Sequence, residues 1–182
     1  MVELSPLGIE GAWLFTSPIH TDERGFFREW FQLDVVERTI GRSFSIAQSN
    51  ISKSKKGVVR GIHFNTSTQG QAKWITCTSG SIWDVVVDIR PNSPTFKKWV
   101  ARELSAHDGK SIFISEGLGH AFLALEDDSV VTYLLSSPYA PESEFSINPT
   151  DPDIGIEWPL RDLQFSLRDQ SAPSLIEYFN AR

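Results

Sequence analysis

Short apolar runs separated by turn residues recur along the whole chain, a pattern typical of β-strands. Residues 81–89 (SIWDVVVDI) show it best, because strand geometry places Asp84 and Asp88 on the face opposite Trp83 and Val85. One face of this strand is therefore fully apolar and the other is mixed. The predicted strands span residues 12–15, 45–51, 57–64, 73–77, 81–89, 98–104, 111–114 and 130–135.

Glycine and proline occupy the joints between these runs, at 80, 91–94, 109, 117–119, 138 and 141. Helical patterns are few. One covers residues 33–40 and ends at Gly41, and a C-terminal turn opens at Ser174, with Glu177 completing a capping box. Many short strands in one unit must close on themselves or form two sheets to hide their edges. We expect an all-β jelly-roll barrel with short peripheral helices, forming a single domain over residues 1–182.

Composition restricts the class of partner. Hydrophobic residues make up 40% of the chain and charged residues 22%, as in globular proteins. The net charge of −6 offers no basic field for nucleic acid or a membrane surface, so an anionic ligand must meet a few placed cations such as Arg24, Arg60 and Lys73. The single cysteine, Cys77, excludes an internal disulfide and favours a reducing compartment. The chain shows neither a signal peptide nor a membrane span, and we expect a cytoplasmic protein.

Several common chemistries lack their motifs. The chain contains no dinucleotide-binding G-x-G-x-x-G and no G-x-S-x-G nucleophile elbow, and residues 109–111 fail as a P-loop because Leu104 replaces the first glycine. Among the histidines, His20 and His107 lie between polar turn residues and are predicted to be solvated. His63 lies within an apolar strand, and His120 follows a glycine-rich turn at a predicted barrel mouth. Both are candidates for chemistry, although a lone strand histidine is more often structural.

A metal site is not predicted. Cupin-type jelly rolls commonly bind a metal through an H-x-H pair, a glutamate and a later histidine. Here Asn65 occupies the second position of that pair, which leaves only His63 and His120. Two imidazoles are too few for a divalent ion, which normally takes three or more protein ligands.

Nine ordered segments carry a family resemblance. They are residues 22–29 (DERGFFRE), 48–50 (QSN), 57–63 (GVVRGIH), 84–90 (DVVVDIR), 93–96 (SPTF), 119–122 (GHAF), 139–144 (YAPESE), 158–159 (WP) and 166–169 (SLRD). From about Leu4 to about Pro173 the chain resembles the dTDP-4-dehydrorhamnose 3,5-epimerase family. The resemblance implies a cupin jelly roll, a homodimer, no metal or other cofactor, and a dTDP-linked 4-keto-6-deoxyhexose substrate that is inverted at C3 and C5.

The implied chemistry is physically coherent. A ketone at C4 acidifies the C–H bonds at C3 and C5 because the carbanion spreads onto oxygen as an enolate. A base, a cation for that oxygen and an acid on the other face of the ring are sufficient. By the resemblance, His63 is the base, Asp169 its partner, Lys73 the cation and Tyr133 the acid. Without the family resemblance, Lys73 would be interpreted as a surface lysine and Tyr133 as an aromatic residue of the barrel.

The resemblance also implies a set of binding residues. Tyr139 matches an aromatic that stacks on thymine, and the other implied nucleotide or sugar contacts are Arg24, Phe27, Glu29, Gln48, Asn50, Arg60, His120, Glu144 and Arg168. Gln48 and Asn50 are two positions apart, so a regular strand places both on one face. Arg60 and His63 are three apart, which requires a bulge near Gly61 or the end of the strand if both face one ligand.

Three alternatives remain open at this point. Asn65, residues 66–70 and Ser115 depart from the family pattern beside the site, and members that invert only C3 or C5 share the scaffold. A mono-epimerase of a secondary-metabolite pathway is therefore one alternative. A 3,4-ketoisomerase and a non-catalytic sugar-nucleotide-binding cupin are the others, and Tyr133 argues against the former. The joint presence of His63, Asp169, Lys73 and Tyr133 argues against the latter.

Overall fold

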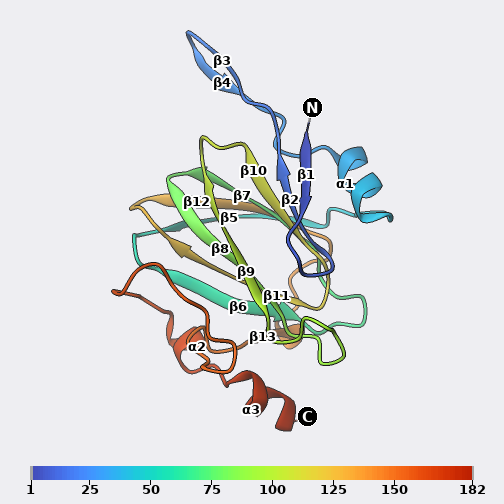
Figure 1. Ribbon diagram of the computed structural model, residues 1–182, viewed down its shortest axis with the longest axis vertical. Helices are drawn as coiled ribbons and strands as arrows, with labels where there is room; N and C mark the ends of the chain where they lie inside the picture. Colours follow the sequence, from blue (N-terminus) through green and yellow to red (C-terminus); the bar gives the residue numbers. More distant parts are fainter. Residues whose placement is uncertain (1, 182) are drawn as a thin grey trace.

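The computed structural model describes residues 2–181 as two antiparallel sheets packed face to face (Figure 1). The six-stranded sheet has the order β1 (Glu3–Pro6), β2 (Ala12–Thr16), β10 (Lys110–Ile114), β7 (Lys73–Ser79), β12 (Ser129–Leu135) and β5 (Gln48–Ser54). The five-stranded sheet has the order β13 (Glu144–Ser146), β6 (Val59–Asn65), β11 (Leu118–Ala124), β8 (Ser81–Asp88) and β9 (Trp99–Ser105). This is the cupin-like, all-β architecture that the sequence predicts.

All eight predicted strands are present, with ends shifted by a few residues. Strand β11 was not predicted, because Gly117 and Gly119 suggested a turn. A Cβ at Gly119 would lie 2.6 Å from the Ile62 side chain, so this glycine marks close packing within a sheet instead. Strands β1, β13 and the pair β3 (His20–Asp22) and β4 (Gly25–Phe27) are too short to show a period of two.

Three apolar clusters stabilise the fold, one between the two sheets and one on the outer face of each. The central cluster lies between them and includes Ile75, Val86 and Phe122. A second covers the outer face of the six-stranded sheet, where Trp74 packs beneath α1 (Leu33–Ile40). The third covers the outer face of the five-stranded sheet beneath α3 (Leu175–Asn180) and includes Val85. Both faces of β8 are therefore buried, with Val86 in the central cluster and Val85 in the cluster beneath α3.

The helices begin and end where the sequence indicates. Helix α1 stops at Gly41, whose φ of 71° lies in the left-handed region and whose N–H donates to the carbonyl of Glu37. The Ser174–Glu177 capping box opens α3. Two further short helices are η1 (Pro141–Ser143) and α2 (Leu167–Gln170). Between residues 2 and 181, no helix has the length and apolar character needed to cross a membrane.

A buried carboxylate organises the turn that follows β8. Asp88 accepts hydrogen bonds from Arg90, Ser93 and Thr95, which together satisfy both of its oxygens. Burial alone would raise the pKa of Asp88, but these hydrogen bonds and the Arg90 charge hold that pKa well below its ordinary value. The turn is therefore fixed by an ionised side chain that is fully inaccessible to solvent.

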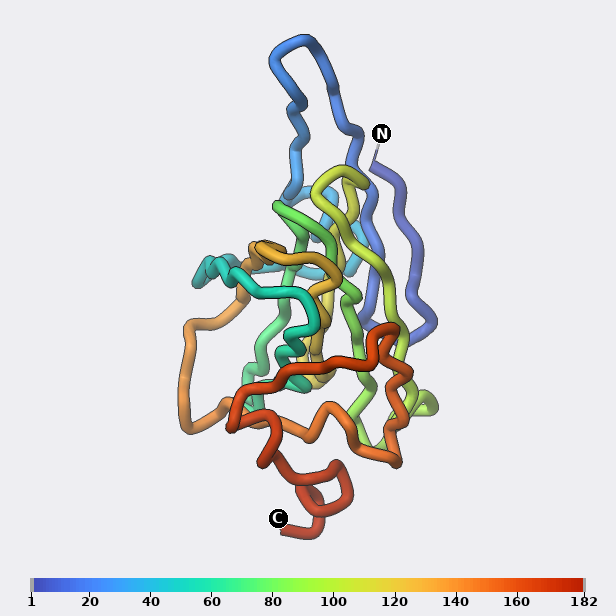
Figure 2. The backbone as a smooth tube through the Cα atoms, turned by 90° about the vertical axis from the view of Figure 1, so that its left-hand side faces the viewer, coloured from blue at the N-terminus to red at the C-terminus, as the bar shows by residue number. Residues whose placement is uncertain are grey.

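The β3–β4 hairpin extends away from the two sheets, as Figures 1 and 2 show from perpendicular directions. It carries Phe26 and Phe27, whose residues are 51% and 64% exposed. Large aromatic side chains this exposed on a projecting hairpin are typical of a contact surface.

Candidate active site

A polar cavity of about 170 Å³ opens between the two sheets, beside the central apolar cluster. Side chains from five strands line it, and they are Ser52, Arg60, His63, Lys73, His120, Phe122, Val131 and Tyr133. Five of these eight are residues that the family resemblance implies. The structure therefore brings His63, Lys73, Tyr133, Arg60 and His120 into one space.

His63 projects from β6 and is held by Asp169 at the start of α2. The two side chains meet through His63 Nε2 and Asp169 Oδ1 at 2.6 Å, although they are 106 positions apart in the chain. The Ser166 hydroxyl caps α2 by accepting from the Asp169 N–H, which fixes the backbone that carries the carboxylate. The histidine and its carboxylate therefore form a rigid pair.

Electrostatics define the state of this pair. Burial of Asp169 would raise the pKa of its carboxyl, but the hydrogen bond and charge of His63, with help from Ser166 and the Gly61 N–H, hold it below its ordinary value. An ionised carboxylate can only accept hydrogen bonds, so His63 Nε2 must be the donor. In the neutral ring, Nδ1 then carries the lone pair that can take a proton.

A bulge in β6 places Arg60 and His63 along the same cavity. His120 of β11 pairs with His63, and Phe122 pairs with Arg60, so three steps along β6 match two along β11. Gly61 lies in the bulge with φ of 124°, and a Cβ there would approach the His120 carbonyl oxygen to 2.5 Å. Of the two expected arrangements, a bulge near Gly61 or the end of the strand, the structure has the bulge, and only glycine fits it.

Lys73 and Tyr133 face His63 from the opposite sheet. Lys73 is buried at the first position of β7, and β12, the neighbouring strand, carries Tyr133. Burial lowers the pKa of Lys73, while the charges of Glu144 and Asp84 partly offset that effect. The surface interpretation of Lys73 is therefore wrong for this fold, because its amine lies within the barrel.

A second histidine–aspartate pair was missed by sequence reasoning. His120 Nε2 lies 2.7 Å from Asp84 Oδ2, and the Asp84 side chain is completely buried on β8. The sequence signal was present, since Asp84 stands on the mixed face of a strand that is otherwise apolar. The pair fixes the orientation of the His120 ring at the cavity wall.

Further polar residues that the resemblance implies lie on β5, on β13 and next to η1, outside the lining of the cavity. Gln48 donates to Asn50 across 2.9 Å and accepts from the Tyr139 N–H, so both amides share one face of β5 as predicted. Asn65, which departs from the family pattern, donates to Glu144 at 2.8 Å. The Tyr139 residue is 56% exposed, which leaves its ring free to stack on a planar group.

A second hollow of about 350 Å³ adjoins the first at Arg60 and His63. Arg168 lines it as well and donates to the Glu144 carbonyl at 3.1 Å. Two guanidinium groups therefore border a compartment next to the candidate base. This arrangement suits a doubly charged anion.

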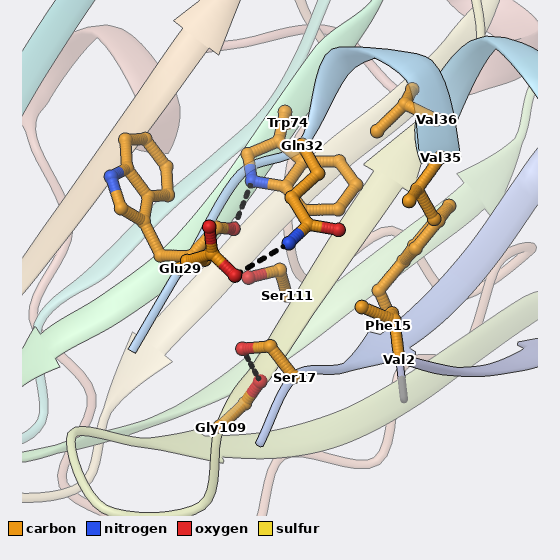
Figure 3. A pocket seen from close by; sticks show the side chains of 11 residues that line it. Val2, Phe15, Ser17, Glu29, Gln32, Val35, Val36, Trp74, Gly109 and Ser111 are labelled. Atoms are coloured by element: carbon orange, nitrogen blue, oxygen red, sulfur yellow. Dashed lines mark hydrogen bonds between the residues drawn. The ribbon is translucent and has the colours of Figure 1, made fainter. Parts of the chain in front are cut away.

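Three implied binding residues lie elsewhere within the chain. Arg24 sits on the projecting hairpin, where it forms an exposed ion pair with Asp22, and Phe27 lies on the same hairpin. Glu29 lines a small apolar pocket on the outer face of the six-stranded sheet and accepts from Gln32 (Figure 3). None of the three lines either hollow beside His63.

Within residues 2–181, no three His, Cys, Asp or Glu side chains lie close enough together to hold a metal ion. A cofactor-free reaction stays a prediction. What the chain's own residues supply is a histidine–aspartate pair, a buried lysine and a tyrosine, all suited to proton transfer at carbon.

A jelly roll with these residues around one cavity has the groups that an isomerase of the epimerase class requires. Residues 6–177 match the sequence profile described as dTDP-4-dehydrorhamnose 3,5-epimerase, and the chain belongs to that family. It is 52% identical over 172 residues to the dTDP-4-dehydrorhamnose 3,5-epimerase of Mycolicibacterium smegmatis, covering 94% of this chain and 85% of that one.

Two solved structures extend the comparison. NovW, a 4-keto-6-deoxy sugar epimerase from the novobiocin biosynthetic cluster of Streptomyces spheroides, superimposes with a TM-score of 0.97 at 42% identity, covering all of this chain and 91% of NovW. ChmJ, a 3′-monoepimerase from Streptomyces bikiniensis solved in complex with dTDP-quinovose, superimposes with a TM-score of 0.92 at 44% identity, covering 97% and 89% of the two chains. Similar relatives thus include a 3,5-epimerase and a mono-epimerase.

Proposed function

We propose that this chain epimerises a dTDP-linked 4-keto-6-deoxy-D-glucose at both C3 and C5, through enolate intermediates, to give the 4-keto-L-rhamnose product. One observation carries the epimerisation itself, and the choice of both carbons follows the 3,5-epimerase family to which the chain belongs. His63 stands on the five-stranded sheet, whereas Tyr133 stands on the six-stranded sheet, and both line the same cavity. A sugar ring between them has the base on one face and the acid on the other, as inversion at carbon requires.

The proton transfers follow from this placement. His63 Nδ1 takes a proton from the carbon beside the ketone, and Asp169 stabilises the imidazolium that forms. The electron pair of the broken C–H bond moves onto the C4 oxygen, where the Lys73 ammonium stabilises the enolate. Tyr133 then donates its phenolic proton to the opposite face of the same carbon, which inverts the centre.

The nucleotide has a matching place beside the sugar cavity. Arg60 and Arg168 border the 350 Å³ hollow and supply positive charge for the diphosphate. The exposed Tyr139 is the residue that we assign to the thymine ring, as the family resemblance implies. ChmJ, crystallised with dTDP-quinovose, supports a dTDP-linked ligand for this chain.

We further propose a homodimer in which one copy completes the site of the other. Arg24 and Phe27 are implied binding residues, yet neither lines the cavity of its own chain, and their β3–β4 hairpin extends away from the two sheets (Figure 1). Equimolar mixing of inactive Arg24→Ala and His63→Ala proteins should restore part of the activity, because one site in each mixed dimer then has both residues intact. Sedimentation of an active wild-type monomer would refute the dimer.

A deuterium experiment tests the proposed reaction and separates it from its alternatives. The substrate dTDP-4-keto-6-deoxyglucose is incubated with the protein in D₂O, and deuterium at C3 and C5 is read by NMR. Incorporation at both carbons, with the L-rhamno product, supports 3,5-epimerisation. Incorporation and inversion at one carbon indicate a mono-epimerase, which the likeness to ChmJ makes the second candidate. If no deuterium is incorporated at either carbon, the ketoisomerase and the non-catalytic binding protein remain. A ketoisomerase converts the 4-keto sugar to its 3-keto isomer, whereas a binding protein leaves the sugar unchanged.

A further inference from the structure

Strand β5 presents a row of polar side chains to the barrel interior. Gln48, Asn50, Ser52 and Ser54 alternate along one face, opposite alternate residues of β12, and Ser52 pairs with Val131. Ser52 also lines the 170 Å³ cavity that contains His63, Lys73 and Tyr133. It is the one polar lining residue of this cavity to which the family resemblance assigns no role.

The other three side chains of this row each have at least one hydrogen-bond partner. Gln48 donates to Asn50, and the Ser54 hydroxyl accepts from Arg60 Nε at 3.0 Å. The Ser52 hydroxyl is shielded from solvent and has no partner among the described residues. Of the six shielded side-chain atoms without a partner, Ser52 Oγ alone belongs to a residue lining this cavity. Buried polar atoms without partners are rare and call for an explanation.

We propose that Ser52 is a sugar-binding residue whose hydroxyl forms a hydrogen bond with a ring hydroxyl of the hexose. This inference rests on the proposed function and adds a specificity contact to it. The other polar side chains of the cavity are ionisable groups suited to moving protons or holding charge. Ser52 is neutral and can both donate and accept, which matches a sugar hydroxyl. Because β5 neighbours β12, the bonded oxygen lies on the Tyr133 side of the ring.

Two ligands without a ketone separate the sugar contact from the nucleotide contacts. Isothermal titration gives the Kd of dTDP-quinovose and that of dTDP for the wild type, for Ser52→Ala and for Ser49→Ala. Ser49 is the matched control, since it lies on β5 but points to the solvent side. Ser52→Ala should raise the Kd of dTDP-quinovose divided by the Kd of dTDP roughly threefold to tenfold, which is the contribution of one hydrogen bond. Ser49→Ala should leave the ratio unchanged.

The unfolding temperature provides a second measurement. If Ser52 served only to stabilise the fold, its replacement would lower that temperature. Ser52 has no partner to lose among residues 2–181, so Ser52→Ala should unfold at or above the wild-type temperature. A variant that unfolds at a lower temperature, or that weakens both ligands equally, overturns the proposal.

The two levels of inference fail differently. If the wild-type protein binds neither ligand and exchanges no deuterium, the proposed function is wrong. If the wild type binds both ligands and the Kd ratio is the same in Ser52→Ala, the reaction stands and the role of Ser52 is refuted.

Discussion

The His63–Asp169 pair gives the sharpest mutational prediction. Replacing Asp169 with asparagine keeps the shape but removes the charge and allows an amide N–H to face His63 Nε2. The 2.6 Å bond then favours the tautomer with its lone pair on Nε2, so Nδ1 holds a proton and cannot act as the base. The imidazolium formed during proton transfer also loses its buried counter-charge. A positioned general base contributes about 10²–10⁴-fold, and we expect a loss in that range, roughly 3–5 kcal/mol on the barrier.

The assay is the initial rate of deuterium uptake from D₂O at C5 and C3, measured at saturating substrate. Asp162→Asn is the matched control, because it removes a carboxylate from the same C-terminal segment at an exposed position. It should exchange at the wild-type rate. Near-ultraviolet circular dichroism of Asp169→Asn must match the wild type, so that the loss is chemical. A variant that keeps more than a third of the wild-type rate would show that Asp169 does not set the tautomer of His63.

Four other expectations follow from the geometry. Lys73→Met should lower the single-turnover exchange rate about 10²–10³-fold, because the enolate loses a preorganised cation. Asp88→Asn should lower the free energy of unfolding in urea by about 2–4 kcal/mol at pH 7. Since the folded pKa of Asp88 is lowered, its contribution is complete above about pH 4 and disappears as pH falls through the folded value, so the two proteins should converge in stability on acidification. Burial raises the pKa of Cys77 to about 11, so a thiol reagent should label it only after unfolding. Gly61→Ala should reduce soluble yield or thermal stability, because its Cβ meets the backbone of β11.

The strands could be predicted because each carries a local signal. Strand β8 shows a period of two, and α1 has both its apolar face and the glycine at its end. Strand β11 was missed because local reasoning treats Gly119 as a turn residue, whereas its role depends on Ile62 of a neighbouring strand. Pairing between distant segments is invisible to a window of nearby residues.

In the candidate site, too, features with a local sequence signal could be predicted, and features that depend on distant residues could not. The position of His63 in an apolar strand marked it as a candidate for chemistry, and its spacing to Arg60 required either a bulge near Gly61 or the end of the strand. The depth of Lys73 did not follow, since a lysine at a strand start is usually solvated. Asp84 was noticed as a polar residue on a mixed face, but its partner His120 is 36 positions away and could only be located in three dimensions.

The attachment of Asp169 also has a consequence for biosynthesis. The carboxylate that orients His63 belongs to a segment after the last barrel strand, and that segment is tied to the start of β6 by paired backbone hydrogen bonds between Gln164 and residues 57 and 59. A nascent chain exposes the histidine more than a hundred residues before its partner is made. The pair that makes His63 a base is therefore completed only after every strand of the two sheets has been synthesised.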